Sequence, residues 1–212
     1  MIFDFDGTLA DSEDLLVELV LRTLGQAGLS AAVPPAAIAR LIGLPLVEVL
    51  AVASGVPPGQ MHDVAALYRS IADSDEVVAR FRLFPGVRAT LQALADSGKE
   101  LAIATSKSRA ITERILAAVG LDDLVGHVVG GDCVRRGKPH PEAVERVLAL
   151  ARCAPERAAV VGDTTFDLEM GKGAGVVTIA ATYGMHDRAT LAALSPDAFI
   201  DAIGELVAPR IS

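Results

Sequence analysis

Short apolar runs alternate with helical patterns along the second part of the chain, and this alternation constrains the fold more than any other feature. After FPGV (84–87) the runs are ELAIAT (100–105), HVVG (127–130), AAVVGD (158–163), VVTIA (176–180) and AFI (198–200). Another apolar run opens the chain at Met1–Phe5. Because parallel strands need crossover connections, usually helices, this order predicts an α/β fold with a parallel, doubly wound sheet.

Residues 10–84 have a different pattern. Their apolar residues all have helical spacing, with breaks at VPP (33–35), GLP (43–45) and GVPPG (55–59), and Ser12 is expected to cap the first helix. We therefore predict a Rossmann-like core of residues 1–9 and 85–212 that carries an inserted all-helical domain, residues 10–84. The insert leaves the first strand at its carboxyl end, where open α/β sheets bind ligands, so it is expected to act as a lid.

The composition excludes several classes of partner. The 212-residue chain has a net charge of -8 and only 4% aromatic residues, which argues against nucleic acid and anionic membranes. It has no run of about 18 uncharged apolar residues and no signal-peptide pattern, so we expect no membrane span and a cytoplasmic location. Cys133 and Cys153 are expected to be buried free thiols. A monomer and a homodimer are both compatible with the sequence.

Polar residues gather where the expected strands end. They are Asp4 and Asp6, then Thr105, Ser106 and Lys107, then Lys138, and last Asp163 and Asp167. Alternation along a strand predicts that Asp4 and Asp6 point to the same side, where two carboxylates about 4 Å apart repel by roughly 4 kcal/mol at an effective dielectric near 20. A hard divalent cation would relieve that repulsion, and Mg²⁺ commonly binds one or two carboxylates together with substrate phosphate oxygens.

This set of residues suits phosphoryl transfer. Lys138 supplies a fixed positive charge, and Thr105 and the backbone N–H groups near Ser106 and Gly7 can donate hydrogen bonds to phosphate oxygens. One carboxylate of the first pair can act as a nucleophile while the other moves the proton of the leaving group and of water. Gly7 is expected to allow a sharp turn, and Thr8 to orient Asp6.

Four motifs occur in the order DFDGT (4–8), Thr105 after an apolar strand, GKPHP (137–141) and GDTTFD (162–167). Together they resemble the motifs of the haloacid dehalogenase superfamily, and the helical insert resembles its cap. The tail, with GDTTFDLEMGKGAGV and YGMHD, is most similar to the phosphoglycolate phosphatase-like branch.

The resemblance implies a role for each matching residue. Asp4 would be the nucleophile and a Mg²⁺ ligand, and Asp6 the acid/base, with its backbone carbonyl on the metal. Thr105 and Lys138 would bind phosphate, Asp163 would bind Mg²⁺, and Asp167 would support the metal site. Gly7, Ser106 and Lys107 are further candidates for substrate binding. Structural readings compete with these roles. Asp163 could be a helix N-cap, Asp167 a helix-dipole partner and His186 an ordinary loop histidine, while Thr105 could be a strand-end hydroxyl, Lys138 a surface lysine, and Ser106 and Lys107 only a loop and helix start.

We therefore expect a Mg²⁺-dependent phosphatase that acts on a small phosphomonoester through an aspartyl-phosphate. Phosphoglycolate is the substrate that the resemblance favours. A sugar-phosphate mutase similar to β-phosphoglucomutase is the alternative, although the loop LIGLPL (41–46) lacks the basic residues of such mutases. A phospho-accepting receiver module is a remote alternative, because such modules are shorter and carry no insert.

Overall fold

The computed structural model describes residues 1–207 of the chain. Its sheet contains the strands β1 (Ile2–Phe3), β2 (Ala102–Ala104), β3 (His127–Val129), β4 (Ala159–Gly162), β5 (Val177–Ala181) and β6 (Ala198–Ile200). The helices of the sheet region are α6 (Val87–Asp96), α7 (Arg109–Val119), α8 (Glu142–Leu150), α9 (Thr165–Gly173) and α10 (Arg188–Ala192). The α/β class expected from the sequence is therefore confirmed.

All six strands are parallel, in the order β3-β2-β1-β4-β5-β6. The first strand lies in the middle, where Phe3 pairs with Ile103 of β2 on one side and with Val161 of β4 on the other. The order of the strands reverses between β1 and β4. In open sheets of this topology, ligands bind at such a switch point, at the carboxyl ends of the strands.

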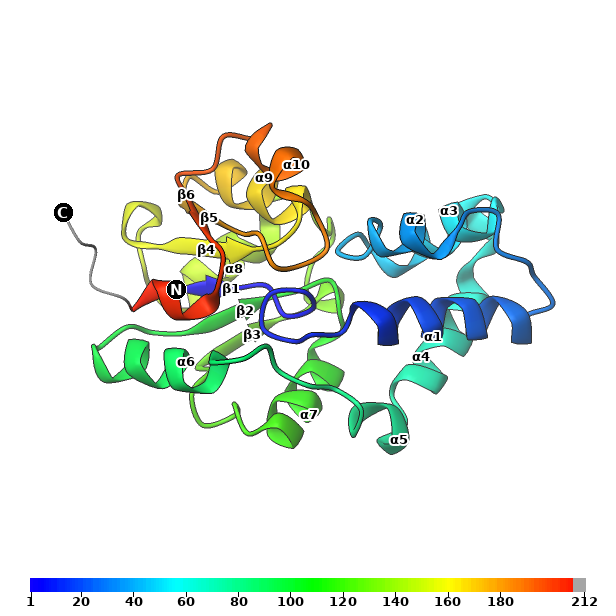
Figure 1. The fold of residues 1–212 in the computed structure, drawn as a ribbon, viewed down its shortest axis with the longest axis horizontal. Coiled ribbons are helices and arrows are strands. Elements are labelled where there is room, and N and C mark those ends of the chain that lie inside the picture. Colours follow the sequence, from blue (N-terminus) through cyan, green and yellow to red (C-terminus); the bar gives the residue numbers. More distant parts are fainter. Residues whose placement is uncertain (208–212) are drawn as a thin grey trace.

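Both faces of the sheet are buried, which explains why its strands read as nearly continuous apolar runs. Phe3, Ile103 and Val161 pack into one cluster with α6 and α7, whereas Ile2 and Val160 pack into a second cluster with α8 and α9. Figure 1 shows α6 and α7 below the sheet and α9 and α10 above it. The sheet is therefore a rigid middle layer whose strand ends hold the loops in place.

The stretch between β1 and α6, residues 10–84, is built from helices and has its own small core. Its helices are α1 (Glu13–Gln26), α2 (Pro35–Ala39), α3 (Leu46–Ser54), α4 (His62–Ala72) and α5 (Asp75–Val78). Val20, Ile38, Leu50, Met61 and other apolar residues of this stretch form a separate buried cluster. We call residues 10–84 the helical segment; Figure 1 shows most of it to one side of the sheet.

The two connections between the helical segment and the sheet region lie side by side. Ala10 and Leu83 form an antiparallel bridge, the Phe84 N–H donates to the carbonyl of Leu9 (3.0 Å), and the Asp11 N–H donates to the carbonyl of Arg82 (2.9 Å). These contacts lie next to the predicted boundaries at residues 9/10 and 84/85. The division into two domains stays a prediction.

Several local expectations need correction. Strand β1 ends at Phe3, two residues earlier than predicted, and the short helix α10 was not predicted. Ser12 stands at the N-cap of α1, but its side chain makes no capping hydrogen bond. Cys133 and Cys153 are free as expected, although both are partly exposed instead of buried. Within residues 1–207, no helix is long and apolar enough to cross a membrane.

Candidate active site

Three carboxylates converge at the switch point of the sheet. Asp4 follows β1, Asp163 follows β4, and Asp167 lies in the first turn of α9. Each offers an oxygen within 4.8 Å of the others, and at most 3% of any of these residues is exposed. The topology explains this convergence because β1 and β4 are neighbours and both end at the same edge.

Lys138 supplies the positive charge of this cluster. Its ammonium lies 2.7 Å from Asp4 Oδ1 and 2.5 Å from Asp167 Oδ1, and its side chain is 2% exposed. Burial alone would lower the pKa of Lys138, but the carboxylates of Asp167 and Asp4 outweigh that effect and raise the pKa. The lysine therefore stays charged. It partly neutralises the three acids.

The cluster still holds more negative than positive charge. Burial raises the pKa of Asp4 to about 7; the Lys138 ammonium opposes this shift, and Asp167 adds to it. Burial, followed by the charges of Asp167 and Asp4, raises the pKa of Asp163 well above its usual range. These shifts express the free-energy cost of burying several carboxylates with a single lysine.

Two kinds of contact fix Asp163. Its Oδ1 accepts a hydrogen bond from Thr8 Oγ1 (2.7 Å), and its Oδ2 accepts one from the Met185 N–H (2.9 Å). Two glycines allow the backbone to approach closely: a Cβ on Gly7 would lie 2.2 Å from Asp163 Oδ2, and a Cβ on Gly184 would lie 2.3 Å from it. Gly7 also has φ +84°, in the left-handed region that favours glycine.

Thr8 therefore does not orient Asp6, as predicted, but holds Asp163. Nor is Asp163 the N-cap of α9, since Thr164 occupies that position.

Asp167 serves the helix and the cluster at once. Thr164 and Asp167 form a capping box at the start of α9, in which Asp167 Oδ2 accepts from the backbone N–H and from the hydroxyl of Thr164. The other carboxylate oxygen accepts from Lys138. Asp167 stands in the first turn of α9, as the helix-dipole reading expects, and its support of a metal site stays a prediction.

The carboxylate of Asp6 does not belong to the acidic cluster. Its Oδ1 accepts from Ser12 Oγ (2.8 Å), and its Oδ2 lies 3.2 Å from the ammonium of Lys107, which in turn stands 5.0 Å from the ring centre of Phe81. The expectation of a shared side for Asp4 and Asp6 assumed a strand through both residues, but β1 ends at Phe3.

Thr105 and Ser106 follow β2, which is the neighbour of β1 in the sheet. The backbone N–H of Thr105 donates a hydrogen bond to the carbonyl of Val129 in β3. The hydroxyl of Thr105 accepts one from the N–H of Lys107 (3.2 Å). Ser106 Oγ donates to the carbonyl of Gly43 (2.6 Å), so this candidate for substrate binding already contacts the helical segment.

His186 forms a second contact between the sheet region and the helical segment. Its Nδ1 accepts from the Thr165 N–H (3.1 Å), which leaves the proton on Nε2 to be donated to the carbonyl of Arg40 (3.0 Å). His186 is 7% exposed and packs edge-on against Phe166. It lies in a loop as expected, but it is a buried bridge with two specific partners.

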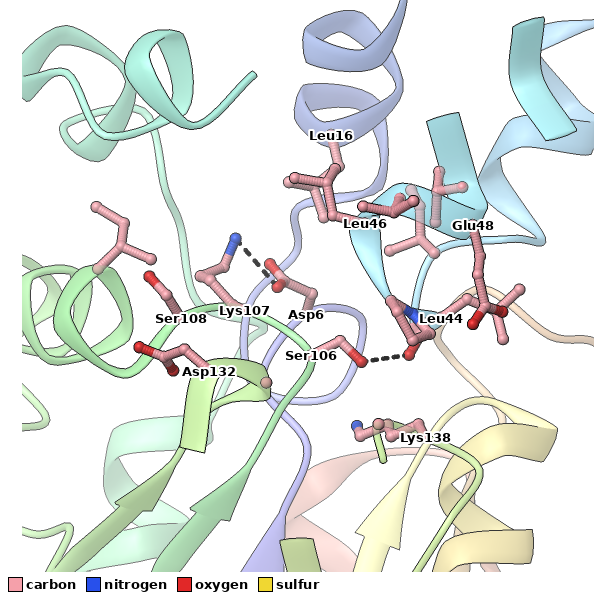
Figure 2. Close-up of a pocket in the computed structure, with 18 of the residues that line it drawn as sticks. Asp6, Leu16, Leu44, Leu46, Glu48, Ser106, Lys107, Ser108, Asp132 and Lys138 are labelled. Carbon is pink, nitrogen blue, oxygen red and sulfur yellow. Dashed lines mark hydrogen bonds and ion pairs between the residues drawn. The ribbon is translucent and has the colours of Figure 1, made fainter. Parts of the chain in front are cut away.

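A cavity of about 930 Å³ lies between the two parts of the molecule (Figure 2). We call one side of the cavity the floor. It consists of Asp6 and the lining residues of the sheet region, which include Ser106, Lys107 and Lys138. The lining residues from the helical segment, which include Leu16, Leu44, Leu46 and Tyr68, form what we call the roof. Figure 2 shows Leu16 and Leu46 on the opposite side of the cavity from Lys138.

The donor set of the acidic cluster fits a divalent cation. Asp4 Oδ1 is buried and lies 2.7 Å from Lys138 Nζ, with which it forms an ion pair. It accepts no well-directed hydrogen bond from any of residues 1–207. Hard carboxylate oxygens in a small buried volume are the ligands that Mg²⁺ prefers. Asp4, Asp163 and Asp167 are therefore able to hold such an ion.

The sequence hypothesis missed Thr8 as the partner of Asp163, His186 as a bridge, and Ser12 as the partner of Asp6. A polar residue directly after the DFDG turn was a signal for Thr8. The other two contacts join residues of distant segments or of an irregular turn, and no local pattern marks such contacts.

Comparison with known proteins identifies the family. A model of the family "Haloacid dehalogenase-like hydrolase" matches residues 1–181. The chain is 36% identical to the "Probable phosphatase IndB" of Dickeya dadantii (98% of this chain, 91% of the relative). It is 32% identical to the plasmid-borne "Phosphoglycolate phosphatase" of Cupriavidus necator, with the same shares covered.

The structural comparison agrees with the sequence comparison. The crystal structure of a "Putative haloacid dehalogenase-like hydrolase" from Bacteroides fragilis superposes with a TM-score of 0.91 and 29% identity, over 97% of this chain and 98% of that chain. The family match and the relatives extend across both the sheet region and the helical segment. The chain therefore belongs to the haloacid dehalogenase-like hydrolase family.

Proposed function

We propose that the protein is a Mg²⁺-dependent phosphatase that hydrolyses a phosphomonoester through an aspartyl-phosphate on Asp4. The observation that carries this proposal is the convergence of three buried carboxylates and Lys138 at the switch point of the sheet. The name phosphatase in the relatives supports it. A cytoplasmic location, and a monomer or homodimer, stay predictions.

In the proposed reaction, a carboxylate oxygen of Asp4 attacks phosphorus and the bond to the leaving oxygen breaks. Asp6, which lines the cavity, donates a proton to that oxygen. The same carboxylate then takes a proton from water, whose oxygen attacks the phosphorus of the aspartyl-phosphate. This second step releases inorganic phosphate and restores Asp4.

Asp4, Asp163 and the backbone carbonyl of Asp6 would hold Mg²⁺, with Asp167 in support. When bound, the ion would neutralise charge on the carboxylates and on the phosphate oxygens. Thr105, Lys138 and backbone groups near Gly7 would hold the phosphate, and Lys107 is placed to contact it or to keep Asp6 in position. Ser106 is a weaker candidate, because its hydroxyl is engaged by Gly43.

The helical segment would act as a cap. It supplies the roof, and the contacts of Ser106 with Gly43 and of His186 with Arg40 join it to the sheet region. A substrate between roof and floor would be shielded from bulk water, which strengthens the interactions of charged groups with the phosphate.

The test is release of inorganic phosphate from a panel of phosphomonoesters, with and without Mg²⁺. The panel includes phosphoglycolate, the substrate that the resemblance favours, together with sugar phosphates and nucleotides. Asp4→Asn should lower turnover by roughly a thousandfold or more, because it removes the nucleophile. Asp14→Asn, the same change at an exposed aspartate, should leave turnover unchanged.

A thermal unfolding series gives an independent readout of the metal. Mg²⁺ at about 100 times its Kd should add about 2.7 kcal/mol to the free energy of unfolding of the wild type, and clearly less in Asp163→Asn. If the enzyme instead isomerised a sugar phosphate, that result would contradict the phosphatase function and support a mutase. A long-lived phospho-Asp4 without turnover would favour the receiver module.

A further inference from the structure

We propose that the preferred substrate carries a bulky, uncharged and largely apolar leaving group, and that Glu48 disfavours leaving groups with a negative charge. This inference rests on the phosphatase function proposed above and names the substrate class of the same site. It is carried by the size of the cavity, the composition of its roof and the unpaired carboxylate of Glu48.

The cavity is large for a two-carbon acid. Its volume of about 930 Å³ lies near the upper end of the roughly 300–1,000 Å³ range of pockets that enclose drug-sized ligands. A phosphate group on the floor leaves most of this space for the organic part of the ester. A leaving group as small as glycolate would leave most of the roof without a contact.

The space is not the result of a detached helical segment. Ser106 binds the carbonyl of Gly43, His186 binds the carbonyl of Arg40, and a Cβ on Gly43 would already lie 3.2 Å from the ring of Phe166. The loop around Gly43 is thus seated against the floor. The cavity next to it keeps its volume in this closed arrangement.

The roof is mainly apolar. Leu44, which follows Gly43, Leu46 and Val47 of the first turn of α3, and Tyr68 of α4 line the cavity and are each partly exposed. Figure 2 shows Leu46 and Leu16 facing the cavity. Such a surface gains free energy by removing an apolar or aromatic group from water, at roughly 25 cal/mol per Å² of apolar area.

The charges around the roof oppose an anionic leaving group. Among the described residues of the helical segment that line the cavity, there is one cation, Arg69, and there are two acids, Glu48 and Asp73. Glu48 is exposed to the cavity and forms no hydrogen bond or ion pair through its side chain with any of residues 1–207.

The positive charges of the floor are two paired lysines and two exposed arginines. Lys107 and Lys138 are paired with Asp6, Asp4 and Asp167. Arg135 and Arg136 line the cavity with exposed side chains, at its rim, in the loop whose N–H groups bind Glu142. A carboxylate or a second phosphate beside Glu48 would therefore meet an unpaired negative charge, whereas the lining cations that form no ion pair within residues 1–207, Arg69, Arg135 and Arg136, have exposed side chains.

The test compares esters of similar chemical reactivity with the Mg²⁺-loaded full-length enzyme. Benzyl phosphate has a bulky, uncharged leaving group, 4-carboxybenzyl phosphate adds a carboxylate to the same frame, and ethyl phosphate and phosphoglycolate are small. We expect kcat/KM for benzyl phosphate to exceed that for ethyl phosphate and for phosphoglycolate by about tenfold or more, from the added apolar contact. We also expect it to exceed that for 4-carboxybenzyl phosphate by several-fold.

Two variants assign the preference to the roof. Glu48→Gln should raise kcat/KM for 4-carboxybenzyl phosphate about threefold and leave that for benzyl phosphate unchanged, since only the repulsion between charges is removed. Glu76→Gln, at an exposed position of α5, is the matched control and should change neither. Leu46→Trp should lower kcat/KM for benzyl phosphate while ethyl phosphate, which does not reach the roof, reports an intact floor.

The outcomes separate this inference from the function on which it rests. Release of phosphate from phosphoglycolate in preference to benzyl phosphate, or no response to Glu48→Gln, would overturn the substrate class and leave the phosphatase in place. Release from none of the esters, with wild type and Asp4→Asn alike, would overturn the phosphatase itself.

Discussion

The floor and the roof of the cavity differ in how their polar groups are held. On the floor, Asp6, Lys107 and Lys138 each have a charged partner, and the acidic cluster beneath is almost fully buried. On the roof, the side chain of Glu48 has no hydrogen-bond or ion-pair partner within residues 1–207, and most of the other lining residues of the helical segment are apolar. The ion pairs of the floor hold its side chains in one geometry, which suits one reaction. The side chains of the roof make few polar contacts, so they can be substituted without changing the geometry of the floor.

Lys138→Met should break the floor most severely. It leaves Asp4 and Asp167 buried without their cation, and removing one partner of a buried ion pair costs about 3–5 kcal/mol. We expect that loss in the free energy of unfolding of the metal-free protein, measured by denaturant titration, together with at least a hundredfold loss of turnover.

Lys99→Met, at an exposed lysine, is the control and should change neither quantity. Equal stability of Lys138→Met and the wild type would contradict the picture of a floor held together by this ammonium.

Gly7→Ala should damage the acidic cluster beneath the floor through shape alone. The new Cβ would lie 2.2 Å from Asp163 Oδ2 and would have to adopt φ +84°. The positive φ costs about 1–3 kcal/mol, and displacement of Asp163 should lower turnover by about a hundredfold.

Gly28→Ala separates the two effects, because Gly28 has φ +72° and no atom lies within 4 Å of its Cβ position. It should lose stability to a similar extent but keep its turnover. If Gly28→Ala also lost activity, backbone strain and not the approach to Asp163 would explain the result.

Ser106→Ala should have the smallest effect, at the junction of floor and roof. It removes the hydrogen bond to the carbonyl of Gly43, worth about 0.5–1.5 kcal/mol. We expect faster hydrogen exchange in the loop around Gly43 and a KM raised a few-fold, with kcat nearly unchanged. Ser70→Ala, at an exposed serine, should change neither. A large fall in kcat would instead place the hydroxyl of Ser106 on the phosphate.

The polar residues at the strand ends beneath the floor were more predictable from the sequence than the roof, for a physical reason. Asp4, Thr105 and Asp163 directly follow apolar strands, and parallel strands bring such residues to a single edge of the sheet. The fold class followed from the same alternation. Asp6 was misplaced because the argument from alternation needs a strand, and β1 ends before it.

The roof depends on how helices pack and on contacts between distant segments, such as His186 with the carbonyl of Arg40. The apolar residues of LIGLPL indicated its character. They did not indicate the volume of the cavity or the unpaired state of Glu48.

The paired connections at Ala10 and Leu83 have a consequence for how such enzymes diversify. The two ends of the helical segment meet in one short antiparallel bridge, so the segment enters and leaves the sheet region at the same place. A different segment, longer or shorter, could be joined at the same two positions, provided that it covers the apolar residues of the sheet region with which Leu15, Leu16 and Leu19 now form one cluster. Recombination at this one junction would change the substrate that the enzyme binds, while the residues that carry out hydrolysis stay the same.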